Sequence, residues 1–506
     1  MKSGKLANKF WLWLAAIVIT AFFCVTPLAS STLTATAATT IYAAPTYQYN
    51  ASWYDELGIT AYNNYLQELQ STNGLKKVTV AVVDSGLDYT SSAVFDGRVI
   101  TQYAKNFNLT DKRTAADWHQ DESGHGTHVA GVIAAGSMAN VQILPIRIFV
   151  GENNAMTFSV FHEAINYVCQ MQRTLNIVAV NLSLGTKGIS RDDYATEAEF
   201  NAAFARDLNT YQPYVNRLRR AGILPIAAAG NIDTKTGETD TKSYYAFPAS
   251  CEGAISVSAY YRDGATAKRA SFSYYNERIS LSAPGAEIWS ACSSYVVPTD
   301  SSSLIPYPQA GEGVHYFKNS AGNYIYVRQH NVDGATYYDL RSQGTSMATP
   351  FVTLCYALLC SDPGKTTAEA WGVEWDDSVD TAAPYYYLNP QHKALLLNAT
   401  DFYLKNEPGK TDVYFGYGGV NVKAFAADEV TKQASKTEDD VIAPSLPTYT
   451  APTNTTAQEV ANWAGVFWLL VGMALVIVLI GFLRTYAVRR NGFSNVINEV
   501  NNDDDA

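Results

Sequence analysis

Four polar residues carry the side chains that nucleophilic catalysis needs. Asp84 and Asn231 each close an apolar, strand-like run. His125 and Ser346 each stand among glycines and other small residues at the start of an apolar, helix-like stretch. Taken singly, each has an ordinary explanation as a turn aspartate, a turn asparagine, a packed histidine or a capping serine. Four such placements in one chain favour a single site over four coincidences.

These residue types match the roles of serine-dependent acyl transfer. The hydroxyl of Ser346 is a weak nucleophile until an imidazole, here His125, takes its proton. A carboxylate, here Asp84, would fix the tautomer of the imidazole and stabilise its protonated form. The side-chain amide of Asn231 and the backbone N–H of Ser346 would donate hydrogen bonds to the oxyanion of the tetrahedral intermediate.

The segment around Ser346 predicts the start of a helix. Gly344 and Thr345 precede the serine, and the apolar run from Phe351 to Cys360 follows it. Pro350 is compatible with such a helix in its first turn, where a missing N–H removes no intrahelical bond.

A second histidine, His128, leaves a metal-binding alternative open. His125 and His128 are three residues apart, a spacing that could place two ligands on one helix face. No third ligand of the H-E-x-x-H type accompanies them, so we expect no metal site here.

The elements that must position these residues alternate between apolar runs and helix-like stretches. This alternation predicts an α/β domain with a mostly parallel sheet, whose ligand-binding residues gather at the carboxyl ends of the strands. Five runs are expected to be strands: Lys76–Asp84, Val141–Val150, Leu175–Gly185, Gly222–Asn231 and Ala254–Tyr260.

Five motifs give the chain a family resemblance. They occur in the order VVDSG, GHGTHVAG, NLSLG, AAAGN and GTSMATP, and a closing segment reads FGYGGVNVKAF. This series resembles the subtilisin-type serine peptidases, or subtilases. The resemblance implies a subtilisin-like three-layer fold over residues 45–427, a catalytic triad of Asp84, His125 and Ser346, and an oxyanion hole made by Asn231 and Ser346. It also implies a protein or peptide substrate and no cofactor.

The resemblance further assigns two segments to substrate binding. In subtilases these segments flank the substrate backbone and the pocket for the residue before the cleaved bond. The corresponding residues here are Ser183, Leu184, Gly185, Ala228, Ala229 and Gly230.

Several features depart from the family pattern. Residues 46–69 look like the start of the catalytic domain, which leaves little space for a folded inhibitory propeptide. The chain passes through residues 136–142 almost directly to the next strand, so we expect no calcium at that connection.

Two insertions stand out: Lys187–Asn216, which is expected to be helical, and the tyrosine-rich Val296–Leu340. The second could rim the cleft or form a surface β-hairpin, and we favour the hairpin.

Apolar segments near both ends predict the compartment. Residues 1–44 have the charged, apolar and small-residue regions of a signal peptide, with a retained anchor helix as the alternative. Residues 463–483 carry no charge over 21 positions, which is enough to span a bilayer. Three arginines follow this span, so residues 484–506 should be a cytoplasmic tail. The domain would lie outside the cell membrane, joined to it by a Thr- and Pro-containing linker, residues 428–462.

An exported domain permits disulfides. Cys251 and Cys292 are the candidate pair, whereas Cys169, Cys355 and Cys360 are expected to be buried thiols.

The net charge of −11 argues against nucleic acid as a partner. The order of leader, peptidase-like domain, linker and membrane helix resembles the mycosins, membrane-anchored subtilases of type VII secretion systems. The leading hypothesis is therefore a membrane-tethered endopeptidase. The alternative is a scaffold that stabilises a secretion complex, with dispensable proteolysis.

Overall fold

The computed structural model describes Tyr42 and residues 49–109, 113–149, 157–320, 322–363 and 412–423. The predicted membrane span, the linker and the tail lie outside these residues, as does the predicted leader apart from Tyr42. None of the helices in the described ranges is both long enough and apolar enough to cross a membrane.

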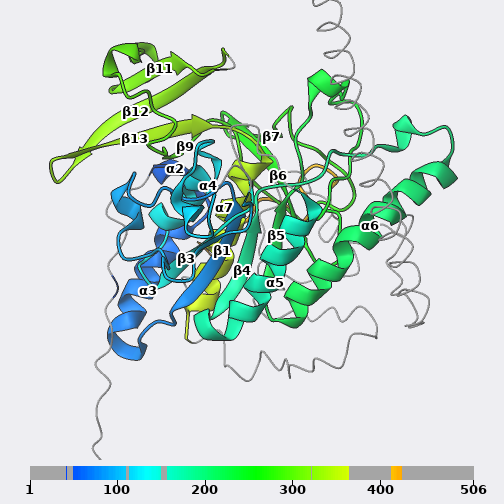
Figure 1. The fold of residues 1–506 in the computed structure, drawn as a ribbon, viewed down its shortest axis with the longest axis horizontal. Coiled ribbons are helices and arrows are strands. Elements are labelled where there is room, and N and C mark those ends of the chain that lie inside the picture. The colour runs from blue at the N-terminus through cyan, green and yellow to red at the C-terminus, as the bar shows by residue number, and fades with distance from the viewer. Residues whose placement is uncertain are drawn as a thin grey trace, which may run out of the picture. The chain divides into compact units, whose positions relative to one another are not determined.

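An eight-stranded sheet forms the centre of the domain, in the order β2-β3-β1-β4-β5-β6-β7, with β8 also pairing with β6 (Figure 1). All its pairings are parallel except that of β6 with β7. The five predicted strands are confirmed as β1, β3, β4, β5 and β6. The strand bounds are β1 Val78–Asp84, β2 Lys105–Asn106, β3 Val141–Arg147, β4 Ile177–Leu182, β5 Leu224–Ala228, β6 Ile255–Asp263, β7 Thr266–Arg269 and β8 Leu281–Pro284.

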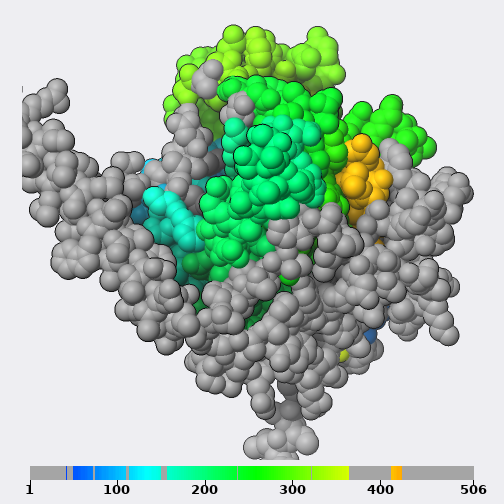
Figure 2. All heavy atoms as spheres, turned by 90° about the vertical axis from the view of Figure 1, so that its right-hand side faces the viewer, coloured from blue at the N-terminus to red at the C-terminus, as the bar shows by residue number. Residues whose placement is uncertain are grey.

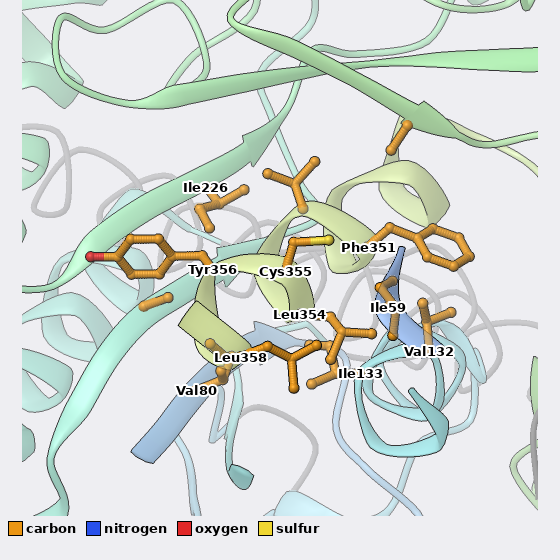
Figure 3. Packing of buried hydrophobic residues seen from close by; sticks show 14 of the residues in the cluster. Ile59, Val80, Val132, Ile133, Ile226, Phe351, Leu354, Cys355, Tyr356 and Leu358 are labelled. Carbon is orange, nitrogen blue, oxygen red and sulfur yellow. The ribbon is translucent and has the colours of Figure 1, made fainter. Parts of the chain in front are cut away.

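Helices cover both faces of this sheet. Successive side chains of a strand point to opposite faces. Accordingly, Val80 of β1 packs in one core with Val132 of α4 and Leu354 of α7 (Figure 3), whereas Val83 packs in another with Phe161 of α5. The predicted three-layer arrangement is therefore confirmed. The helix bounds are α2 Ala51–Glu56, α3 Ile59–Asn73, α4 His125–Ala135, α5 Phe158–Leu175, α6 Glu197–Arg220 and α7 Thr345–Ser361.

Segments from both ends of the described chain belong to this domain. Tyr54 of α2 and Tyr62 of α3 are buried in the same core as α4 and α7, as expected for the start of the domain. Near the other end, Gly419 pairs with Ser282 of β8. Figure 2 shows residues 412–423 in orange at the surface, beside green residues from the middle of the chain.

The two predicted insertions have defined structures. The first contains most of the 24-residue helix α6, whose start is fixed by a capping box between Thr196 and Glu199. The second forms most of an antiparallel sheet, β10-β11-β12-β13-β9, which confirms the hairpin prediction (Figure 1). Its bounds are β9 Ile288–Ala291, β10 Ile305–Pro306, β11 Val314–Lys318, β12 Tyr324–Val332 and β13 Ala335–Ser342.

The predicted disulfide between Cys251 and Cys292 is wrong, because both thiols are free. Cys251 packs in a core cluster with Phe204 beneath α6, whereas Cys292 packs in a different cluster with Val327 of β12. A bridge requires Cα atoms roughly 4.4–6.8 Å apart, a tertiary property that spacing along the chain does not reveal. Burial raises the pKa of Cys251 well above its usual range, so this thiol stays protonated.

Candidate active site

The site lies at the carboxyl edge of three adjacent parallel strands, β1, β4 and β5. Asp84 is the last residue of β1, Ser183 follows the last residue of β4, and Asn231 lies three residues beyond the end of β5. Neighbouring strands are about 4.8 Å apart, so their ends bring residues from distant parts of the chain side by side. The helices α4 and α7, which begin at His125 and Thr345, pack against the same face of this sheet.

The first half of the site is a buried carboxylate bound to a partly exposed imidazole. Nδ1 of His125 donates to Oδ1 of Asp84 over 2.7 Å, and the backbone N–H of Ser85 donates to the same oxygen over 2.7 Å. The side chain of Asp84 is 1% exposed and that of His125 is 24% exposed. Burial alone would lower the pKa of His125, but the charge and hydrogen bond of Asp84 outweigh burial and raise it.

Gly126 allows this pair to approach closely. A Cβ atom at position 126 would lie 2.1 Å from the carbonyl oxygen of Gly86 and 3.1 Å from Cβ of Asp84. Any side chain there would push the first turn of α4 away from the end of β1. The glycine after His125 is therefore required by the contact between helix and strand.

A second carboxylate, Asp121, holds the loop that carries His125, and the sequence analysis missed it. Asp121 is fully buried and accepts hydrogen bonds from Thr127 N (2.8 Å), Thr127 Oγ1 (2.6 Å), Gly124 N (3.0 Å) and Ser85 Oγ (2.8 Å). It thereby satisfies N–H groups at the start of α4 that have no helical partner. An acidic residue just before a predicted helix start was the available signal.

The second half of the site is the start of α7. Every residue of Thr345–Ser361 is buried except Ser346, which is half-buried. Pro350 is the sixth residue of this helix and not in its first turn, so that expectation was wrong. Its missing N–H leaves the carbonyl oxygen of Ser346 without the usual helical donor. The hydroxyl of Ser183 replaces that donor over 2.7 Å, so Ser183 anchors Ser346 to the end of β4.

Asn231 is held by the residue before the serine. Its Oδ1 accepts hydrogen bonds from the backbone N–H of Thr345 (2.9 Å) and from Thr345 Oγ1 (3.2 Å). Because the amide oxygen is occupied in this way, the Nδ2 group remains the available donor. Nδ2 lies near Gly344, at the entrance to α7, where a Cβ atom would be 3.3 Å away from it.

Ser346 and Asn231 line a common pocket of about 290 Å³. Four of the six predicted substrate-binding residues also line it: Leu184, Gly185, Ala228 and Gly230. The other two, Ser183 and Ala229, are buried and are absent from the pocket lining.

No hydrogen bond joins the hydroxyl of Ser346 to His125 within the described part of the chain. Among the described residues, its Oγ donates to the carbonyl oxygen of Ser183 over 3.1 Å. Rotation about one side-chain bond changes the direction of a serine hydroxyl. The pair with His125 would therefore have to form by such a turn.

His128 has a structural position. Its Nε2 contacts the carbonyl oxygens of Ile288 and Leu340 over 3.0 and 3.1 Å, which links α4 to β9 and β13. Burial lowers the pKa of His128 to about 4, so the ring is neutral and its Nε2–H donates to these carbonyls. This nitrogen is already occupied, and the pairing of His125 with His128 as metal ligands gains no support.

Comparison with known proteins places this sequence in a family. The model of the subtilase family, Peptidase S8, matches residues 75–418. The chain belongs to the subtilases. The match includes all four of the residues Asp84, His125, Asn231 and Ser346, in the order Asp, His, Ser for the three triad residues.

Individual subtilases resemble parts of this chain. Alkaline protease 1 of Aspergillus flavus is 32% identical over 215 residues, 42% of this chain and 43% of that protein. The thermophilic serine proteinase of Bacillus sp. (strain AK1) is 29% identical over 306 residues, 57% of this chain and 65% of that protein. The chain thus spans under half of the length of the first relative.

Among solved structures, fervidolysin from Fervidobacterium pennivorans, a keratinolytic enzyme related to subtilisin, is similar. It is 24% identical with a TM-score of 0.45, and the alignment covers 73% of this subtilase and 45% of fervidolysin.

Proposed function

We propose that this subtilase is a serine endopeptidase that cleaves protein substrates through an acyl-enzyme. The hydrogen bond between Asp84 and His125 carries the proposal, because a buried carboxylate fixes an imidazole whose ring remains 24% exposed. Purified protein is expected to cleave quenched fluorescent peptides, and Ser346→Ala is expected to abolish cleavage. Equal cleavage by both proteins would contradict the proposal.

The chemistry proceeds in two steps. Ser346 Oγ turns toward Nε2 of His125, gives up its proton and attacks the substrate carbonyl carbon. The backbone N–H of Ser346 and the amide of Asn231 donate to the resulting oxyanion. Protonated His125 then gives its proton to the leaving amine, and the C–N bond breaks. Water, deprotonated by His125, hydrolyses the ester and restores the serine.

Removing the amide donor tests the oxyanion hole. For Asn231→Ala we expect kcat to fall about 100- to 1,000-fold, the known effect of losing this donor in a subtilase, with a small change in KM. Steady-state kinetics on one peptide measures both constants. Thr345→Ser, which keeps the hydroxyl bound to Asn231, is the matched control and should retain most activity. A fall in kcat below threefold for Asn231→Ala would remove Asn231 from the oxyanion hole.

The protonation state of His125 predicts the pH profile. The base must be neutral to accept a proton, and Asp84 raises the pKa of His125 above its usual value. The kcat/KM should therefore rise with pH, with the midpoint of its acid limb above about 6.5. A profile measured from pH 5 to 9 checks this prediction. An acid midpoint well below 6.5 would contradict the charged pair.

We also propose that the enzyme acts outside the cell membrane and is anchored by residues 463–483. The support is the uncharged 21-residue run, with Arg484 directly after it and Arg489 and Arg490 a few residues further on. A protease added to intact cells should degrade the domain and spare a tag placed on the C-terminus. The reverse pattern would overturn this orientation.

The predicted order of leader, peptidase domain, linker and membrane helix supports a mycosin-like role in a secretion system. The partners would then be components of the secretion complex. Cells carrying Ser346→Ala at the native locus would separate two roles. Lost processing of a secreted protein would support the peptidase role. Unchanged processing and secretion in this variant, together with lost secretion in a full deletion, would support a scaffold.

A further inference from the structure

The pocket beside Ser346 has a carboxylate in its wall. Glu238 lines the pocket together with Ser346 and Asn231, yet its residue is only 5% exposed. Whatever fills the pocket is thus adjacent both to the proposed nucleophile and to an acidic side chain.

Only one oxygen of Glu238 is satisfied. Oε2 accepts hydrogen bonds from the hydroxyl of Tyr274 (2.6 Å) and from the backbone N–H of Asp233 (2.9 Å). Oε1 is buried and has no hydrogen-bond partner in the described part of the chain. A buried carboxylate oxygen without a partner is costly, and a cationic donor is the group that relieves this cost best.

The surrounding residues fix Glu238 in place. Tyr274 stacks on Tyr244, with ring centroids 5.0 Å apart. Gly230 has a φ of +109°, and a Cβ atom there would lie 2.3 Å from Cδ2 of Tyr274, so the ring fills the space that a side chain would take. Burial and the bond to Glu238 both raise the pKa of Tyr274, which keeps its hydroxyl protonated and donating.

The rest of the lining suits a long basic side chain. Leu184 and Ala228 provide apolar surface for an aliphatic stem, as lysine and arginine require. Asp233 and Lys187 also line the pocket, and both are exposed. With one ammonium group against two carboxylates, the lining has a net negative charge.

We propose that Glu238 is a specificity-determining residue, and that the enzyme prefers arginine or lysine directly before the cleaved bond. This proposal rests on the peptidase function proposed above and names its substrate class. The charged head of the substrate residue would supply the donor that Oε1 lacks once a small rotation of the carboxylate turns Oε1 toward the pocket, while Tyr274 continues to hold Oε2.

Two peptides that differ only in arginine or leucine before the cleaved bond test the proposal. Wild-type protein is expected to have a kcat/KM at least about 10-fold higher for the arginine peptide. In Glu238→Gln, which keeps an acceptor for Tyr274 but removes the charge, this ratio should fall about 10- to 100-fold. Asp240→Asn, an exposed acid on the same loop, is the control and should keep the ratio. A wild-type preference for leucine, or an unchanged ratio in Glu238→Gln, would overturn the proposal.

A binding measurement separates this proposal from the catalytic one. In Ser346→Ala, calorimetry with peptides that end in arginine or leucine reports on the pocket without turnover. Tighter binding of the arginine peptide, lost in the double variant with Glu238→Gln, would support the proposal even if wild-type protein cleaved nothing. Equal binding of both peptides would overturn it, even if leucine peptides were cleaved.

Discussion

Replacing His125 with alanine is expected to lower kcat for peptide hydrolysis about 10⁶-fold, the known cost of losing the triad histidine in a subtilase. The serine proton then has no base to accept it, because among the described residues the hydroxyl of Ser346 donates to the carbonyl oxygen of Ser183, which is not basic enough to take a proton. KM should change little, since the pocket wall contains no atom of His125. Steady-state kinetics on the purified wild-type and His125→Ala proteins measures this fall in kcat.

A histidine elsewhere provides the control for this variant. His162 lies on α5, on the other face of the sheet, where its Nδ1 contacts the hydroxyl of Tyr214 over 2.6 Å. His162→Ala should keep wild-type kcat. Thermal unfolding of both variants checks that the domain is intact. If folded His125→Ala kept more than about a thousandth of wild-type kcat, another base would have to activate the serine.

The second large effect is expected for Asp84→Asn, with a fall in kcat of about 10⁴-fold. An asparagine amide can present an N–H to Nδ1 of His125, which would leave the ring proton on Nε2 and block the base. The substitution also removes the charge that raises the pKa of His125. The acid limb of the residual kcat/KM should therefore shift to lower pH than in wild type.

The shift of the acid limb distinguishes this role from a loss of folding. A destabilised protein would lose active molecules without moving the pH midpoint. Asp96 is an exposed aspartate twelve residues after Asp84, and Asp96→Asn is the matched control. It should leave kcat and the pH midpoint unchanged. An Asp84→Asn protein with a tenth of wild-type kcat and the wild-type midpoint would show that Asp84 does not tune His125.

The parts of the fold that could be predicted are those whose burial leaves a pattern of apolar residues in the sequence. The strands β1, β3, β4, β5 and β6 were found because strands buried on both faces give continuous apolar runs. The short strands β2, β7 and β8 were not predicted, because two to four residues carry too little periodicity. The disulfide prediction failed because the distance between Cys251 and Cys292 depends on packing alone.

The sequence motifs predicted the functional groups of the candidate site, but not the hydrogen bonds that hold them in place. Asp84, His125, Asn231 and Ser346 stand in recognisable motifs. Ser183 was predicted to bind substrate, and the structure adds a contact that was not predicted, in which its hydroxyl donates to the carbonyl oxygen of Ser346. That contact depends on two segments meeting at the sheet edge, so the identity of the partner cannot be read from either segment alone.

One feature of the sequence does indicate that the carbonyl oxygen of Ser346 needs such a hydrogen bond. Pro350 lies four residues after Ser346, so in a continuous helix it necessarily leaves the serine carbonyl without a donor. The carbonyl oxygen of Ser346 therefore needs a hydrogen-bond donor from outside the helix, and a side chain from a neighbouring segment is the expected source. A helix carbonyl that is shielded from water rarely remains without a partner.

The proposed mechanism requires that His125 can reach the hydroxyl of Ser346. Reaction with a fluorophosphonate, followed by mass spectrometry of the peptides, tests this most directly. The account predicts one phosphonate adduct, on Ser346, in wild-type protein, and none in His125→Ala. An adduct on Ser346 that forms at the same rate without His125, or no adduct on Ser346 in the active enzyme, would contradict it.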